Sequence, residues 1–142
     1  MKRVNHLYEK VYDIENLRLA HKNASKGKGW YQEVKMINKD PDYYLRILQD
    51  MLKNKTYRTS QYVTFTKTEK SKEERVISKL PYFPDRICHW AILQIIEPIL
   101  IKNFIADTYS AIPNRGVHYG IRRIKKSMKD DENGCRYCLK QK

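Results

Sequence analysis

Glycine, proline and cysteine are all scarce in this chain. Glycine and proline occur five times each in 142 residues, and neither the Walker A nor the Rossmann glycine pattern is present, so a glycine-rich phosphate loop is not expected. The three cysteines (Cys88, Cys135 and Cys138) form an odd set, which favours a reducing, intracellular location and indicates the cytoplasm.

No apolar run reaches the roughly 18 residues of a membrane-spanning helix, and residues 1–10 lack the apolar segment of a secretory signal. We therefore expect no association with a membrane.

Acidic residues are also few, with 16 Asp and Glu against 29 Lys and Arg, a formal net charge of +13. Hydrophobic residues make up 41% and aromatic residues 11%, which is too apolar a mixture for wholesale disorder. The length fits one domain. A large positive surplus favours a phosphate-rich partner, usually nucleic acid, and the alternative is a basic surface that only aids solubility.

Apolar spacing predicts three helices in the first third of the chain. The first covers residues 11–24 with Asp13 as a cap, and a short second helix begins near Trp30. The third begins with Asp40 as N-cap and Pro41 at its first position, a strong start signal. The basic, glycine-containing loop 26–29 separates the first two helices.

The residue pattern then changes to one typical of β-strands. Residues 62–66 and 76–77 are β-branched and aromatic, and the charged segment 67–74 lies between them, which predicts a β-hairpin. Lys67 and Arg75 flank its tip, where they could hold a triphosphate or a nucleic-acid backbone. The alternative is an ordinary solvated hairpin whose glutamates offset its lysines.

The second half of the chain predicts two further helices and a terminal strand. Asp85 is expected to cap a strongly apolar helix that Pro98 bends or ends. A basic helix is expected over 116–129, and a strand over 136–140. The predicted order of elements is helices, a hairpin, two further helices and a final strand. This order predicts an α+β fold.

Metal and nucleophile signals are weak. Cys135 and Cys138 form half of a zinc pattern without a second half. The acidic run 130–132 could hold a cation, but a solvated turn explains it more simply. No catalytic or metal-ligating residue is assigned.

Several blocks together resemble a known family. Residues 80–87 (Leu-Pro-Tyr-Phe-Pro-Asp-Arg-Ile), the step Ile96-Glu97-Pro98, Phe104, and a block from Tyr109 to His118 occur in one order. This order resembles the fingers of reverse transcriptases (RNA-directed DNA polymerases) of group II introns, retrons and phage diversity-generating elements. In the last block Pro113, Arg115 and His118 match the family pattern, whereas the chain departs from the Gly-Phe-Arg part that precedes the proline in that pattern.

The resemblance implies a fold, partners and site residues. Residues 1–56 would form a helical N-terminal extension, and residues 57–142 the fingers of a right-hand polymerase, ending at the first palm strand. Lys67 and Arg75 would bind the phosphates of the incoming nucleotide. The RNA template and DNA primer would be bound by Arg86, Arg115, Arg122 and Arg123.

The resemblance also predicts what this chain does not do. Residues 137–140 resemble the strand leading to the first catalytic aspartate, which normally lies two residues beyond the lysine, and position 142 is Lys. We therefore expect the chain alone to be catalytically inactive, with no cofactor of its own, and Mg²⁺ to act in the complete polymerase. Two alternatives remain: a stand-alone basic RNA- or DNA-binding module, and a fragment that docks a separate palm chain.

Overall fold

The computed structural model describes residues 3–68, 74–109, 112–129 and 139. The chain divides into two compact units, residues 1–99 and residues 100–142, and each is described by itself. The boundary predicted between residues 56 and 57 separates a helical extension from polymerase fingers. It rests on the resemblance to a polymerase and stays a prediction.

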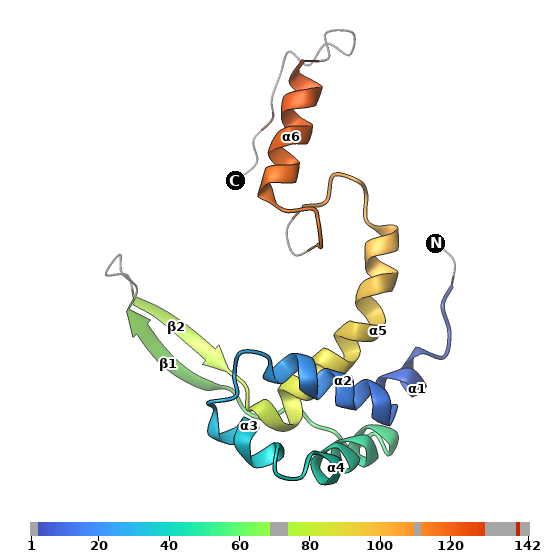
Figure 1. The fold of residues 1–142 in the computed structure, drawn as a ribbon, viewed down its shortest axis with the longest axis vertical. Helices are drawn as coiled ribbons and strands as arrows, with labels where there is room; N and C mark the ends of the chain where they lie inside the picture. Colours follow the sequence, from blue (N-terminus) through green and yellow to red (C-terminus); the bar gives the residue numbers. More distant parts are fainter. Residues whose placement is uncertain (1–2, 69–73, 110–111, 130–138, 140–142) are drawn as a thin grey trace. The chain divides into compact units, whose positions relative to one another are not determined.

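Four helices open the first unit (Figure 1): α1 (Leu7–Val11), α2 (Ile14–Ser25), α3 (Gln32–Ile37) and α4 (Pro41–Lys53). The side chain of Asp13 accepts hydrogen bonds from the backbone N–H groups of Glu15 and Asn16 and so caps α2. Asp40 accepts from the N–H of Tyr43 at the start of α4. Both predicted caps are confirmed, because each carboxylate satisfies amides that a first helical turn leaves unpaired.

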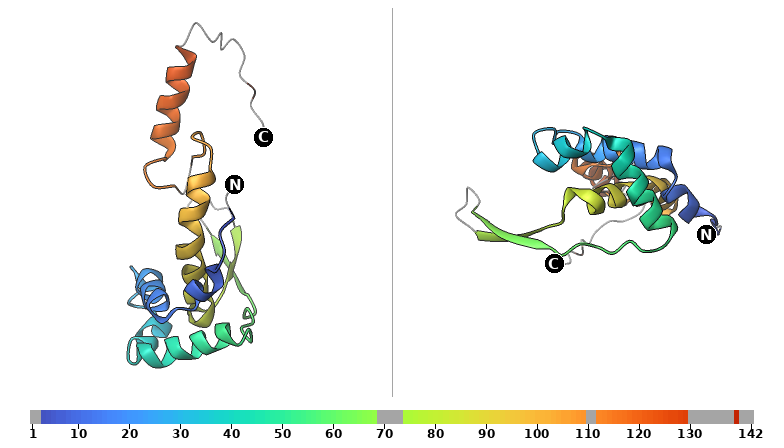
Figure 2. Two further views of the ribbon diagram at one scale, coloured as in Figure 1. Left: turned by 90° about the vertical axis from the view of Figure 1, so that its right-hand side faces the viewer. Right: turned by 90° about the horizontal axis from the view of Figure 1, so that it is seen from below.

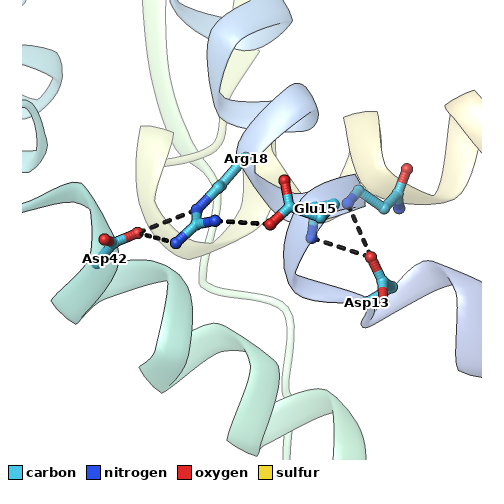
Figure 3. A network of polar contacts seen from close by, with 5 residues as sticks. Asp13, Glu15, Arg18 and Asp42 are labelled. Carbon is cyan, nitrogen blue, oxygen red and sulfur yellow. Dashed lines mark hydrogen bonds and ion pairs between the residues drawn. The ribbon is translucent and has the colours of Figure 1, made fainter.

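Apolar faces of these helices form the core. Leu17, Ile37, Leu45 and Leu48 are almost fully buried, and Ile87 from the start of α5 joins them. Helices α2 and α4 are also linked at their surface. There Arg18 donates to Asp42 at 2.9 Å and to Glu15 at 2.6 Å (Figure 3).

A β-hairpin follows, formed by β1 (Val63–Thr68) and β2 (Glu74–Lys79) as an antiparallel pair. It extends away from the helices of its unit, as Figure 1 and the right-hand view of Figure 2 show. The hairpin prediction is confirmed, but both strands reach further into the charged segment than expected. Every residue of the two strands is exposed except Ile77, which is partly buried, so both faces of the ribbon are largely open to solvent.

A short helical turn, η1 (Tyr82–Arg86), leads into α5 (Ile87–Asn103). The prediction that Asp85 caps this helix is wrong. Its buried carboxylate accepts hydrogen bonds from the Tyr57 hydroxyl and the Ser60 N–H. Pro98 does not end the helix, which continues to Asn103, since a proline removes only one N–H donor from the helical ladder.

The second unit contains α6 (Val117–Met128), which Gly116 precedes, close to the predicted bounds. Gly120 is buried against the ring of Tyr109, where an added Cβ would lie 3.3 Å from the nearest ring atom. The expected C-terminal strand, the acidic run 130–132 and the Cys135–Cys138 pair lie outside the described residues.

Helices and a two-stranded antiparallel sheet together make the fold α+β. None of the helices in the described ranges has the length and hydropathy that a membrane crossing requires.

Candidate nucleic-acid interface

Lys67 and Arg75 are direct cross-strand partners in the hairpin. Side chains of directly opposed residues lie on the same face of an antiparallel pair. Both residues are exposed. The register therefore places two predicted phosphate-binding cations side by side, where one anion can contact both.

The same face of the hairpin continues toward its base with the pair Phe65–Ile77. Strand residues two apart share a face, so this apolar pair adjoins the pair Lys67–Arg75. Phe65 and Ile77 line a cavity of about 460 Å³. One face of the ribbon thus carries both the cation pair and a wall of the cavity.

The cavity is lined by basic and aromatic side chains from several segments of the first unit. The basic residues are Lys28, Lys79, Arg86 and His89. The aromatic residues are Tyr31, Tyr62, Phe65 and Tyr82. Basic side chains interleaved with aromatic rings are typical of surfaces that bind single-stranded nucleic acid.

Two of these cations, Lys28 and Arg86, lie close enough to repel each other. Lys28 is half-buried, and its pKa is lowered first by burial and then by repulsion from Arg86. Within the described part of the chain, neither Lys28 nor Arg86 forms an ion pair. An anion between them would relieve this repulsion.

Lys79 differs, because it has a carboxylate nearby. Its Nζ lies 3.9 Å from Oε1 of Glu33 and 5.3 Å from the centre of the Tyr31 ring. The other carboxylate oxygen of Glu33 accepts a hydrogen bond from the backbone N–H of Tyr82. Glu33 therefore links α3 to β2 and η1, and it fixes one side of the cavity.

Asp85 anchors the segment that leads into β1. Its Oδ1 accepts from the Tyr57 hydroxyl at 2.6 Å and from the Ser60 N–H at 3.2 Å. Burial by itself raises the pKa of this carboxyl, but the hydrogen bonds from Ser60 and Tyr57 outweigh it, so the pKa lies below its ordinary value. Burial, followed by the bond to Asp85, raises the pKa of Tyr57.

The remaining predicted arginines belong to the second unit, and two of them are already engaged. Arg123 donates to Asp107 at 2.6 Å, and Arg115 donates to the carbonyl of Ile105 at 3.2 Å. Asp107 also accepts from the Tyr109 hydroxyl at 2.6 Å. Arg122 is exposed and, among the described residues, has no ion pair.

Three of the predicted binding residues thus lie in one region of the first unit, although they are separated in the sequence. Lys67 and Arg75 adjoin each other, and Arg86 lines the cavity on the same side of the hairpin. Sequence reasoning did not select Lys28 or Phe65. The basic loop 26–29 was a usable signal for Lys28, whereas nothing local pointed from Phe65 to a cavity.

Within the described ranges, no group of three His, Cys, Asp or Glu side chains is placed to hold a metal ion. Comparison of the chain with protein-family models and with curated proteins gave no match.

Proposed function

We propose that this chain is the fingers portion of an RNA-directed DNA polymerase and that it binds nucleic acid and nucleotide phosphates. One observation carries the proposal: a single face of the hairpin presents the cation pair Lys67–Arg75 next to the basic and aromatic cavity that contains Arg86. The order of the blocks in residues 80–118 supports the polymerase assignment, and the net charge of +13 supports a polyanionic partner.

The roles follow from the chemistry of each side chain. Arg75 presents a forked donor and Lys67 a compact charge, so together they suit a triphosphate or two neighbouring backbone phosphates. Arg86 lies at the cavity and would contact the template or primer backbone. Arg115, Arg122 and Arg123 would add contacts from the second unit, and the engagement of Arg123 with Asp107 makes it the least available of the three.

The proposal assigns binding to this chain and phosphoryl transfer, with Mg²⁺, to the complete polymerase. Primer extension on an RNA template by this chain alone is expected to yield no product. A magnesium-dependent product would contradict that division of roles.

Binding itself is tested by fluorescence anisotropy with labelled RNA and DNA oligonucleotides over a range of salt concentrations. The logarithm of the association constant is expected to fall linearly with the logarithm of the salt concentration, because each neutralised phosphate releases condensed counterions. The absence of binding at low salt would contradict the proposal.

A second candidate function, docking to a separate palm chain, is favoured by α6. This helix exposes four apolar side chains at a spacing that forms one stripe: Val117, Ile121, Ile124 and Met128. An Ile124→Ser variant separates the two functions, because it removes an apolar side chain from the stripe and leaves the charge of α6 unchanged. It should lose a docked partner while oligonucleotide binding, which depends on the basic side chains, stays unchanged.

A further inference from the structure

The two faces of the β1–β2 hairpin differ in chemistry. One face carries the pairs Val63–Lys79, Phe65–Ile77 and Lys67–Arg75. The opposite face carries three other pairs: Thr64–Ser78, Thr66–Val76 and Thr68–Glu74. Aromatic and paired cationic side chains therefore occur on only one of the two faces of these described strands. A hairpin that served solubility alone would not need this asymmetry.

The aromatic side chains of this region remain accessible. Phe65 is 46% exposed and Tyr62 is 62% exposed, although both line the cavity. A ring exposed beside cations offers a surface on which a nucleobase can stack. The cavity volume of about 460 Å³ lies in the range of pockets that take small organic ligands.

We propose that this cavity binds one unpaired nucleotide of a single-stranded nucleic acid, with its phosphate held by Lys28 and Arg86 and its base stacked on Phe65. The inference rests on the proposed function and extends it by naming the form of nucleic acid and the pocket that selects it. A base inside a duplex is stacked and paired, so it must leave the helix, at a free-energy cost, before it can enter such a pocket. The site therefore favours single strands over duplexes.

The electrostatics of the cavity support a phosphate at this position. Burial and the neighbouring Arg86 both disfavour the charged form of Lys28 and lower its pKa. A phosphate bound by both side chains offsets each effect. Lys79 is less suited to this role, because Glu33 lies 3.9 Å from its Nζ.

The test compares a fluorescein-labelled oligothymidine of about eight nucleotides, within the site size of small single-strand binding surfaces, with a labelled hairpin duplex. For a Phe65→Ala variant we expect about tenfold weaker binding of the single strand, as the loss of one stacking contact implies. Duplex binding and the salt dependence should stay unchanged. The matched control is Val76→Ala, which removes an exposed apolar side chain from the opposite face of the same hairpin.

A second pair of variants tests the phosphate contact. Lys28→Ala should reduce the slope of log K against log salt for the single strand by about 0.7, the value for one phosphate contact. Lys26→Ala removes the same charge from the same loop but from a residue that does not line the cavity. The slope of log K against log salt for Lys26→Ala should lie closer to that of the unaltered chain than the slope for Lys28→Ala does.

Trp30 provides a local optical signal that does not require a substitution at Phe65 or Lys28. Its ring is 71% exposed and lies 4.2 Å, centre to centre, from the ring of Tyr31, which lines the cavity. In a Trp90→Phe background, which leaves Trp30 as the remaining tryptophan, the single strand should change the fluorescence and the duplex should not. This signal tests the pocket even where Phe65→Ala fails to fold.

The outcomes separate the two proposals. If neither probe binds at low salt, the proposed function fails and this inference fails with it. If both probes bind equally, with no change at Trp30 and no difference between Phe65→Ala and Val76→Ala, the nucleotide pocket is overturned while the proposed function stands.

Discussion

The hydroxyl of Tyr57 donates a hydrogen bond of 2.6 Å to Oδ1 of Asp85, a carboxylate with no solvent exposure. Oδ2 of the same carboxylate has no hydrogen-bond partner among the described residues. The bond joins the segment before β1 to the turn before α5. It therefore sets where the hairpin leaves the helical part of its unit.

Removing this hydroxyl is predicted to destabilise the protein. Tyr57→Phe leaves a buried carboxylate with one donor fewer, which should lower the free energy of unfolding by about 1–3 kcal/mol. Urea denaturation followed by circular dichroism measures the change. Tyr43→Phe is the matched control, because Tyr43 is 58% exposed, and it should have little effect. Equal stabilities of the two variants would show that the buried bond contributes nothing.

Stability is predicted to decrease in alkaline solution. Burial raises the pKa of Tyr82 to about 12, from about 10 in the unfolded chain. A group whose pKa is higher in the folded state gives its full stabilisation below the unfolded pKa and loses it as the pH rises toward the folded value. The free energy of unfolding should therefore fall between about pH 10 and pH 12.

Tyr82→Phe checks this assignment. The variant loses the hydrogen bonds of the hydroxyl with His21, so it should be less stable near neutral pH. Its stability should nevertheless fall less steeply in the alkaline window, although Tyr57, whose pKa is also raised, retains its own contribution. An unchanged slope of stability against pH would contradict a role for Tyr82.

The N-cap of α4 is expected to contribute measurable stability. Asp40→Ala removes the carboxylate that accepts from the N–H of Tyr43 at 3.1 Å, which should cost about 1 kcal/mol. Asp50→Ala removes an exposed acid from the C-terminal half of the same helix, where a negative charge gains nothing from the helix dipole. Thermal unfolding should show a lower midpoint for Asp40→Ala than for Asp50→Ala.

The parts of the fold that could be predicted from the sequence are those with local causes. Asp40 followed by Pro41 marks a helix start by cap chemistry alone, and β-branched residues around 62–66 mark a strand. Asp85 misled the prediction because its local context is that of a cap. Its hydrogen-bond partners, Tyr57 and Ser60, come from a segment that tertiary packing brings beside it.

The candidate site was predictable only where the chain itself brings residues together. A hairpin necessarily places its two strands side by side, so Lys67 and Arg75 could be paired in advance. The meeting of Lys28 with Arg86 depends on how the loop before α3 packs against the turn before α5. No local pattern encodes that contact.

The cation pair of the hairpin is predicted to account for part of the affinity for nucleic acid. A Lys67→Ala/Arg75→Ala variant should bind a single-stranded oligonucleotide more weakly, with a slope of log K against log salt smaller by about 1.4, the sum of two phosphate contacts of about 0.7 each. The charge-matched control is Lys22→Ala/Lys53→Ala, which removes two exposed lysines from α2 and α4. General attraction changes equally in the two variants, so the difference between them reports the hairpin contacts.

The most direct test of the central claim is the salt dependence of oligonucleotide binding, measured side by side for the unaltered chain and these two double variants. We predict binding at low salt, a linear decrease of log K with log salt, and a smaller slope for Lys67→Ala/Arg75→Ala than for Lys22→Ala/Lys53→Ala. Equal slopes for the two variants, or no binding by the unaltered chain at low salt, would contradict the claim that this hairpin face binds nucleic acid.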